Sequence, residues 1–177
     1  MKHTNIYIIL ISIFLSSNIY AQQADTIKVN TATKKITIGK RVINGTTTIE
    51  QIKKMFGNPD RVEKLAGKVR VFAYDRLGFS VELGRDTTVR TITSFAITYN
   101  FDGDKKVSKN RYNGVLLLDK YPITKSTSGS DINTNTAIKL NCLGTIMCVT
   151  DPNWKGMAVV ITYQKESKEI AVIGFKL

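Results

Sequence analysis

The sequence predicts an α+β protein in which a short helix followed by an antiparallel β-meander occurs twice. The strands of both copies are expected to form one curved antiparallel sheet, with the short helices packed on one face. Residues 36–52 recur in register as residues 116–132, and residues 78–83 align with residues 156–161. Several short segments also alternate apolar and polar residues with a period of two, which is typical of half-buried strands. Self-similarity at a nearly fixed offset indicates one structural unit built twice.

The N-terminal residues 1–21 are expected to be a secretory signal peptide. Lys2 precedes an apolar stretch at residues 6–15, and the small residue Ala21 precedes a polar segment. The apolar stretch is about half as long as the ~20 residues that a membrane-spanning helix needs. No cysteine lies near the expected cleavage point. The mature protein is therefore predicted to be periplasmic or secreted, without a lipid anchor and without stable membrane insertion.

Residues 22–101 are predicted to form the first helix and meander. Strands are expected at residues 26–30 and 35–39. Thr47 and Glu50 have the spacing of a capping box, so a helix should begin at Thr47. Gly57 and Pro59 should end this helix. Alternating segments then predict three strands of an antiparallel meander, at residues 69–73, 79–83 and 93–99.

Residues 113–177 are predicted to form the second unit, after a polar linker or loop at residues 102–112. The order of elements is the same, with a strand at 115–118, a helix at 131–140, and strands at 145–150, 158–163 and 169–175. The second helix should be the weaker one, because residues 133–136 are Asn and Thr, which favour caps and turns over helix interiors.

Residues 44–59 carry a motif that resembles a known family. The motif is similar to the Gly-x-Thr…Val/Ile…Leu/Phe-Gly-x-Pro signature of small bacterial envelope proteins of the SmpA/OmlA type, and the matching residues are Gly45, Thr47, Ile49, Phe56, Gly57 and Pro59. The doubled arrangement resembles tandem β-lactamase-inhibitor-protein-like folds. The resemblance implies a protein-binding or scaffold role for the curved sheet. Two features differ from the family pattern: the lipid-anchoring cysteine is absent, and the second unit lacks the Gly-x-Pro sequence.

The composition is strongly basic, with 26 Lys and Arg against 14 Asp and Glu and a formal net charge of +12. Such an excess attracts anionic surfaces. For an exported protein these are acidic lipid headgroups, acidic polysaccharide or an acidic protein, whereas nucleic acid is not an expected partner. The alternative interpretation is that the charges only keep a β-rich protein in solution.

Histidine is nearly absent from the sequence, and this excludes several kinds of active site. The single histidine, His3, lies in the expected signal peptide. Ser-His-Asp and Cys-His catalysis and the commonest zinc sites are therefore excluded from the mature protein. No catalytic residue, cofactor or metal site is predicted. Four carboxylates leave open an envelope enzyme that acts on polysaccharide through a facing pair, namely Asp75, Glu82, Asp119 and Asp151.

Two cysteines, Cys142 and Cys148, flank a turn that contains a glycine. In an exported protein we expect them to form a disulfide. Closing so short a loop would stabilise the fold by roughly 2 kcal/mol in the chain-entropy model.

Two turns form the candidate binding site. Residues 151–156 contain Trp154, the only tryptophan, followed by Lys155, and the equivalent turn of the first unit contains Tyr74 and Arg76. Tyr, Trp and Arg are enriched where proteins bind one another. Trp154 is expected either to anchor a partner or to fold back over a small core.

These observations favour a non-catalytic, exported interaction module that binds a protein or an anionic envelope component. A carboxylate-dependent envelope enzyme acting on polysaccharide is one alternative. A secreted inhibitor or immunity protein is another; it rests on the fold resemblance alone, and such an analogy does not establish function.

Overall fold

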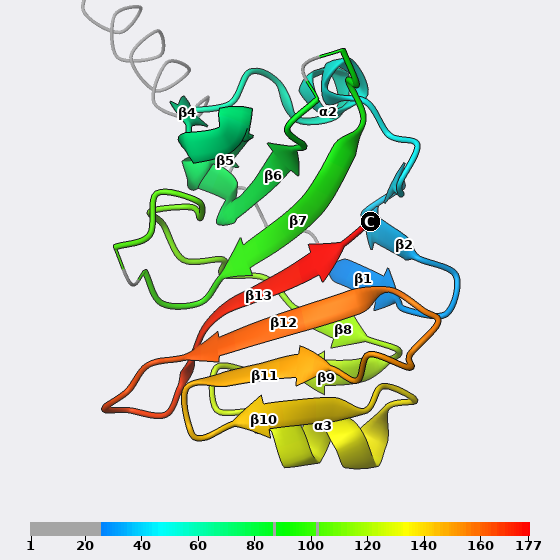
Figure 1. The fold of residues 1–177 in the computed structure, drawn as a ribbon, viewed down its shortest axis with the longest axis vertical. Helices are drawn as coiled ribbons and strands as arrows, with labels where there is room; N and C mark the ends of the chain where they lie inside the picture. The colour runs from blue at the N-terminus through cyan, green and yellow to red at the C-terminus, as the bar shows by residue number, and fades with distance from the viewer. Residues whose placement is uncertain (1–25, 87, 102) are drawn as a thin grey trace, which may run out of the picture.

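The computed structural model describes residues 26–177, apart from residues 87 and 102. The predicted signal peptide therefore lies outside the described residues. This part of the chain folds into two β-sheets and two short helices, so the predicted α+β class is confirmed (Figure 1). Among the described residues, no helix is long and apolar enough to cross a membrane.

The larger sheet has eight antiparallel strands and contains both halves of the chain, in the order β10-β11-β12-β13-β7-β6-β5-β4. Strands β7 (Ile92–Thr98) and β13 (Ile170–Lys176) pair at its centre. The other strands are β4 (Arg61–Lys64), β5 (Arg70–Tyr74), β6 (Phe79–Leu83), β10 (Leu140–Leu143), β11 (Met147–Thr150) and β12 (Ala158–Tyr163). Each half is an antiparallel meander, and the two meanders join along their last strands. Short 3-10 turns, η1 (Ala66–Lys68) and η2 (Asp75–Leu77), precede and follow β5.

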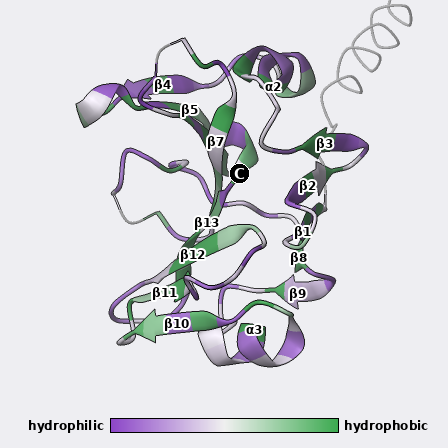
Figure 2. Cartoon of the chain, turned by 45° about the vertical axis from the view of Figure 1, so that its right-hand side comes forward, coloured by the Kyte–Doolittle hydropathy of each residue, from purple (hydrophilic) through white to green (hydrophobic). Residues whose placement is uncertain are grey.

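A smaller sheet of five strands covers one face of the larger sheet, in the order β3-β2-β1-β8-β9 (Figure 2). Its strands are β1 (Ile27–Asn30), β2 (Lys35–Ile38), β3 (Arg41–Ile43), β8 (Leu116–Leu118) and β9 (Tyr121–Ile123). Strand β1 pairs with β8 in parallel, which brings the two halves of the chain together a second time. The prediction of a single sheet was incomplete, because the short strands before each helix pair with one another and cover the apolar face of the larger sheet.

The hydrophobic core lies between the two sheets and is closed by helices α2 (Ile49–Phe56) and α3 (Gly129–Asn135) at opposite ends of the smaller sheet (Figure 2). In β1, Ile27 and Val29 are buried and Lys28 is exposed, as the alternation of side chains in a strand requires. In the larger sheet, the rings of Phe79 and Phe95 stack with their centroids 5.0 Å apart. The face of the larger sheet that points away from this core is called the outer face below.

Helix α2 begins one residue later than predicted. The side chain of Thr48 accepts a hydrogen bond from the backbone N–H of Gln51, and the Gln51 side chain accepts one from the backbone N–H of Thr48. The predicted box of Thr47 and Glu50 was therefore wrong in register. The Thr47 hydroxyl instead accepts a hydrogen bond from the backbone N–H of Asn44, at 3.0 Å, in the turn before the helix.

The remaining residues of the helix motif border α2. Glu50 lies in its first turn and forms an ion pair with Arg90. Gly57 ends the helix with a φ of 81°, a left-handed value that favours glycine, and its N–H donates to the Lys53 carbonyl. Gly45 and Pro59 lie in the turns before and after the helix. The motif therefore starts and stops a helix, as predicted.

Helix α3 spans seven residues, so the predicted range of 131–140 was too late and too long. Ser128 and Asp131 form its capping box, again with reciprocal side-chain and backbone hydrogen bonds. The hydroxyls of Thr134 and Thr136 donate to carbonyls four residues earlier. Such bonds compete with regular helix structure, and Thr136 adopts extended backbone angles that end the helix.

Residues 103–112 contain no helix or strand, as expected for a linker or loop. This segment nevertheless lies on the outer face of β4 to β7. The Ser80 hydroxyl donates to the Lys106 carbonyl at 2.9 Å, and Val107 is buried against β7 and β13. The backbone N–H of Tyr112 donates to the Thr98 carbonyl at 2.7 Å. The segment therefore covers the outer face of the first half of the sheet.

Candidate functional site

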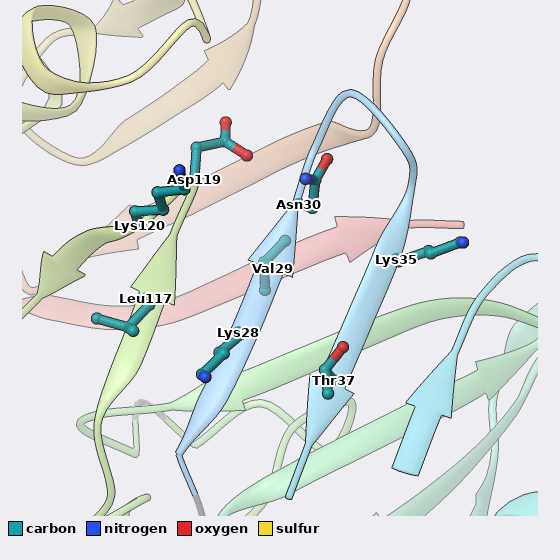
Figure 3. A pocket seen from close by; sticks show the side chains of 8 residues that line it. All are labelled: Lys28, Val29, Asn30, Lys35, Thr37, Leu117, Asp119 and Lys120. Carbon is teal, nitrogen blue, oxygen red and sulfur yellow. The ribbon is translucent and has the colours of Figure 1, made fainter. Parts of the chain in front are cut away.

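A hollow of about 200 Å³ lies on the solvent side of the smaller sheet (Figure 3). Strands β1, β2 and β8 and the turn after β8 form it. The lining residues are Lys28, Val29, Asn30, Lys35, Thr37, Leu117, Asp119 and Lys120. The parallel pairing of β1 with β8 therefore creates the hollow, because it brings residues near position 30 beside residues near position 118.

Three lysines surround this hollow on three sides, and we call Lys28, Lys35 and Lys120 the lysine triad (Figure 3). Lys28 points to solvent because its two neighbours in β1 face the core. Lys35 lies opposite Asn30 in the antiparallel pair of β1 and β2, so it is on the same face as Lys28. Lys120 lies in the β8–β9 turn. Residues that are far apart in sequence therefore place three positive charges around one depression.

The β8–β9 turn is held in place by Asp119. Asp119 and Lys120 both have left-handed backbone angles, with φ of 48° and 76°, which is typical of a tight two-residue hairpin turn. The Asp119 carboxylate accepts hydrogen bonds from the backbone N–H of Thr31 at 2.8 Å and from its hydroxyl at 2.6 Å. Thr31 is fully buried. Asp119, the only carboxylate among the described residues that line the hollow, is therefore bound to Thr31.

The lysine triad carries a local excess of positive charge. In the described part of the chain, none of its members forms an ion pair with Asp or Glu. Clustered charges of one sign raise the local potential and attract a ligand of opposite sign. Ammonium groups, an asparagine amide and a threonine hydroxyl all donate hydrogen bonds, which suits a ligand rich in carboxylate or phosphate oxygens.

Tyr74 and Arg76, predicted as binding residues, both contact the C-terminal end of α2. The Tyr74 hydroxyl donates to the Gly57 carbonyl at 3.2 Å, and burial raises the pKa of the Tyr74 phenol to about 12. The Arg76 guanidinium donates to the Phe56 carbonyl at 2.6 Å and pairs with Asp60 at 2.6 Å. These contacts satisfy carbonyls that the helix end leaves without intrahelical partners.

Trp154 folds back over the core, which is the second of the two expectations for this residue. It is half-buried, and its indole N–H donates to the Met157 carbonyl at 3.2 Å. Its ring lies so close to Gly156 that a Cβ atom there would be 2.5 Å from the ring. Lys155, beside it, is exposed.

The structure does not bring these two turns together. Strands β5 and β11 run in opposite directions in the same antiparallel sheet. The turn with Tyr74 and Arg76 follows β5 at one end of the sheet, and the turn with Trp154 and Lys155 follows β11 at the other end. The four residues therefore do not line a common site.

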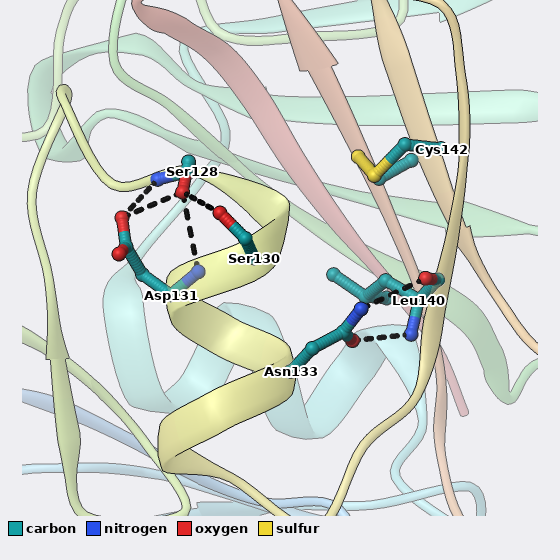
Figure 4. The surroundings of a disulfide bond; sticks show 7 residues. Ser128, Ser130, Asp131, Asn133, Leu140 and Cys142 are labelled. Atoms are coloured by element: carbon teal, nitrogen blue, oxygen red, sulfur yellow. Dashed lines mark hydrogen bonds between the residues drawn. A yellow bond between two sulfur atoms is a disulfide. The ribbon is translucent and has the colours of Figure 1, made fainter.

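The predicted disulfide between Cys142 and Cys148 is present and joins opposite residues of β10 and β11. Helix α3 lies beside the disulfide (Figure 4). It packs directly on the sulfurs at Gly129, where a Cβ atom would lie 2.5 Å from Sγ of Cys142 and 2.7 Å from Sγ of Cys148. The Asn133 side chain of α3 also donates to the Leu140 carbonyl at 3.0 Å and accepts from the Leu140 N–H at 2.6 Å. The disulfide therefore supports a helix as well as closing a loop.

The carboxylates considered for an enzyme each have hydrogen-bond partners of their own. Glu82 accepts from Ser94, Asp119 from Thr31, and Asp151 from Asn153 and Asn141. Burial alone would raise the pKa of the Asp75 carboxyl, but the backbone N–H of Lys109 and the Arg61 guanidinium bind it and hold the pKa below its usual value. Across the described residues, no three His, Cys, Asp or Glu side chains are placed to hold a metal ion.

Comparison with known proteins identifies a family without assigning a function. A family model described as a domain of unknown function, DUF7738, matches residues 26–133, more than half of the chain. The chain belongs to the DUF7738 family. No curated protein and no solved structure matches it. No named family is supported beyond this match.

The DUF7738 match contains the whole of the smaller sheet and every residue that lines the hollow. Sequence reasoning missed this site, because its lysines are separated by up to 92 positions and meet only through the pairing of β1 with β8. Of the residues in the β8–β9 turn, only Asp119 was a candidate, as one of the four carboxylates considered for an enzyme.

Proposed function

We propose that the protein is a non-catalytic interaction module that binds an anionic envelope component, and that the ligand is an acidic polysaccharide held at the lysine triad. The observation that carries the proposal is that three lysines, none with a salt-bridge partner among the described residues, line one hollow. Leu117 supplies an apolar wall between the charges. An acidic sugar, which has a charged group and an apolar C–H face on its ring, suits such a lining.

The size of the hollow favours a saccharide unit over a membrane surface. Its volume of about 200 Å³ is below the 300–1,000 Å³ of pockets for drug-sized ligands, so it suits one charged sugar of a longer chain. A membrane-binding face would instead need apolar side chains that project into the lipid. At the centre of this face lie Lys28 and Thr37, with Leu117 only half-exposed; Val42, which pairs with Thr37 and is 48 % exposed, is the one large aliphatic side chain well exposed on the described part of this face.

We further infer that the protein is exported and that its two halves are copies of one unit. An oxidising compartment is supported by the disulfide. The duplication is supported by matched turn contacts: the backbone N–H of Asn44 donates to Thr47 Oγ1 at 3.0 Å, and that of Thr124 donates to Thr127 Oγ1 at 2.9 Å. A doubled scaffold of the β-lactamase-inhibitor-protein-like kind, with a binding role, is consistent with this order of elements.

The proposal is tested by measuring binding of polygalacturonate, a carboxylated polysaccharide, with isothermal titration calorimetry. The test variant replaces Lys28, Lys35 and Lys120 by Gln. If each lysine contributes about 1 kcal/mol, as lysines do near an anionic surface, affinity should fall by about 100-fold. Binding by the wild type should also weaken with added salt, because exposed charges are screened.

A matched control variant replaces three exposed lysines outside the hollow, Lys54, Lys64 and Lys105, by Gln. It changes the net charge equally, so it should lose much less affinity. Equal losses in both variants would show that net charge alone attracts the polymer. Binding to phosphatidylglycerol vesicles but not to polygalacturonate would contradict the choice of polysaccharide.

A further inference from the structure

The outer face of the larger sheet is covered in its first half and open in its second half. One row of paired residues crosses all eight strands of this face: Asn141, Val149, Val160, Gly174, Ala96, Ser80, Ala73 and Arg61. Within that row Ser80 and Ala73 are buried, whereas Val160 is 41 % exposed. The change occurs where the segment 103–112 stops covering the sheet.

The open half of this face is apolar and has no acidic residue. We call the outward side chains of Leu143, Met147, Val149, Ala158 and Val160 the β10–β12 patch. Leu143 is 59 % exposed, and Met147 and Val149 are half-exposed. Lys176 is the only charged residue among the outward positions of β10 to β13, and no Asp or Glu occurs there.

From these observations we infer that the β10–β12 patch is a docking surface for an extended, acidic and apolar segment of a partner protein. The first half of the same face shows how such a segment is held. Val107 packs on Ala96, Ala171 and Val172 of the sheet, and backbone carbonyls of the segment accept hydrogen bonds from Ser80 and Arg61. A partner segment provides the same cover on the second half.

The charged residues around the patch determine the charge that a partner segment should carry. Lysines lie at both ends of the patch: Lys176 and Lys155 at one end, and Lys168, whose ammonium donates to Thr145 Oγ1 at 2.9 Å, at the other. An apolar segment with Asp or Glu on either side of its centre complements this arrangement. A second copy of this chain does not, because it would place lysines against lysines in a molecule of net charge +12.

The free edge of β10 is not open to an added strand, so the partner segment should bind on the face of the sheet. An added strand would need the N–H and C=O groups that β10 turns away from β11. The Asn133 side chain already binds both backbone groups of Leu140, so the first pairing position is blocked. The partner segment therefore lies across the patch and is not added as a ninth strand.

The inference is tested by selecting a displayed library of random peptides against the protein and synthesising the peptides that are enriched. These are expected to combine Val, Leu or Ile with Asp and Glu. Val160→Lys and, separately, Leu143→Lys should each weaken their binding at least tenfold. Val62→Lys is the matched control, because Val62 is 48 % exposed on a strand of the same sheet and outside the patch. Thermal melting establishes that the three variants fold.

Any one of five results would overturn the inference. The enriched peptides could be mainly basic, or neither Val160→Lys nor Leu143→Lys could weaken the binding of any of them. Val62→Lys could weaken peptide binding as much as the patch variants do. Sedimentation velocity could also show wild-type dimers that Val160→Lys dissociates. Phosphatidylglycerol vesicles that bind the wild type and not Val160→Lys would assign the patch to lipid instead. Binding of polygalacturonate at the lysine triad is a separate measurement, so either proposal can fail alone.

Discussion

The contact between Gly129 and the disulfide predicts that one substitution changes sign when the disulfide is removed. In the wild type, a Cβ atom at position 129 would lie 2.5 Å from Sγ of Cys142 and 2.7 Å from Sγ of Cys148. The two sulfurs are bonded to each other and fixed on adjacent strands, so neither moves aside easily. Gly129→Ala should therefore destabilise the fold by about 1–3 kcal/mol, the usual range for overpacking.

In a background with Cys142→Ala and Cys148→Ala, the same substitution should be neutral or stabilising. The nearest remaining atom is Cβ of residue 148, at 3.8 Å, which is ordinary van der Waals contact. Alanine also favours helix over glycine by up to about 1 kcal/mol. The background itself should be less stable by roughly 2 kcal/mol, because the short loop is no longer closed. The coupling free energy between the substitutions is therefore about 1–4 kcal/mol.

The coupling is measured by urea unfolding of the four proteins of the cycle, followed by the fluorescence of Trp154. Ser130→Ala, at the next and exposed position of α3, is the control and should have the same effect in both backgrounds. If Gly129→Ala changes the free energy of unfolding equally with and without the disulfide, α3 does not rest on the sulfurs and the reasoning is refuted.

Three further predictions concern the segment and the turns around β5. Gly78→Ala should destabilise the fold by more than about 3 kcal/mol, because the φ of Gly78 is 74° and a Cβ atom there would lie 2.4 Å from the Tyr112 backbone. Gly144→Ala is the control, because Gly144 has a φ of 61° with open space around it, so this variant measures only the cost of the left-handed backbone angle. Equal losses of stability for the two variants in chemical unfolding would show that the close approach to Tyr112 costs nothing. Tyr74→Phe should lower stability by about 1 kcal/mol, seen as a melting temperature 2–4 °C lower, since one buried hydrogen bond is lost; no change would refute this role. Asp75 has a lowered pKa, so its ionised form stabilises the fold above about pH 4, and this contribution is lost as the pH falls through the folded pKa. Asp75→Asn should therefore lower the free energy of unfolding at pH 7 and make that free energy fall less steeply below about pH 4. An unchanged dependence of stability on pH would contradict this role of Asp75.

The elements that the sequence predicted well are those with strong local signals. The alternating strands β6, β7, β12 and β13 and the disulfide follow from hydrophobic periodicity and cysteine spacing. The capping box of α2 was predicted one residue too early, because three consecutive threonines, residues 46–48, each offer a hydroxyl. In the structure, the Thr47 hydroxyl is used in the preceding turn, where it accepts from the Asn44 N–H, and Thr48 caps the helix.

The smaller sheet and its site depend on contacts that no local pattern encodes. Strand β8 was predicted, at residues 115–118, but β3 and β9 have three residues each, too few to show a period, and the parallel pairing of β1 with β8 joins distant parts of the chain. Lys28, Lys35 and Lys120 were therefore not predicted as site residues. Tyr74, Arg76 and Trp154 were chosen by residue type, and their hydrogen bonds to helix and loop carbonyls appear only in three dimensions.

The most direct test of the central claim locates the anionic ligand on the protein. Short polygalacturonate fragments are titrated into the ¹⁵N-labelled protein, and the backbone amide shifts are followed by NMR. We expect the largest changes on β1, β2 and the β8–β9 turn, around Lys28, Lys35 and Lys120, and we expect them to disappear when these residues are replaced by Gln. Changes spread over all exposed lysines, or centred on the β10–β12 patch, would contradict it.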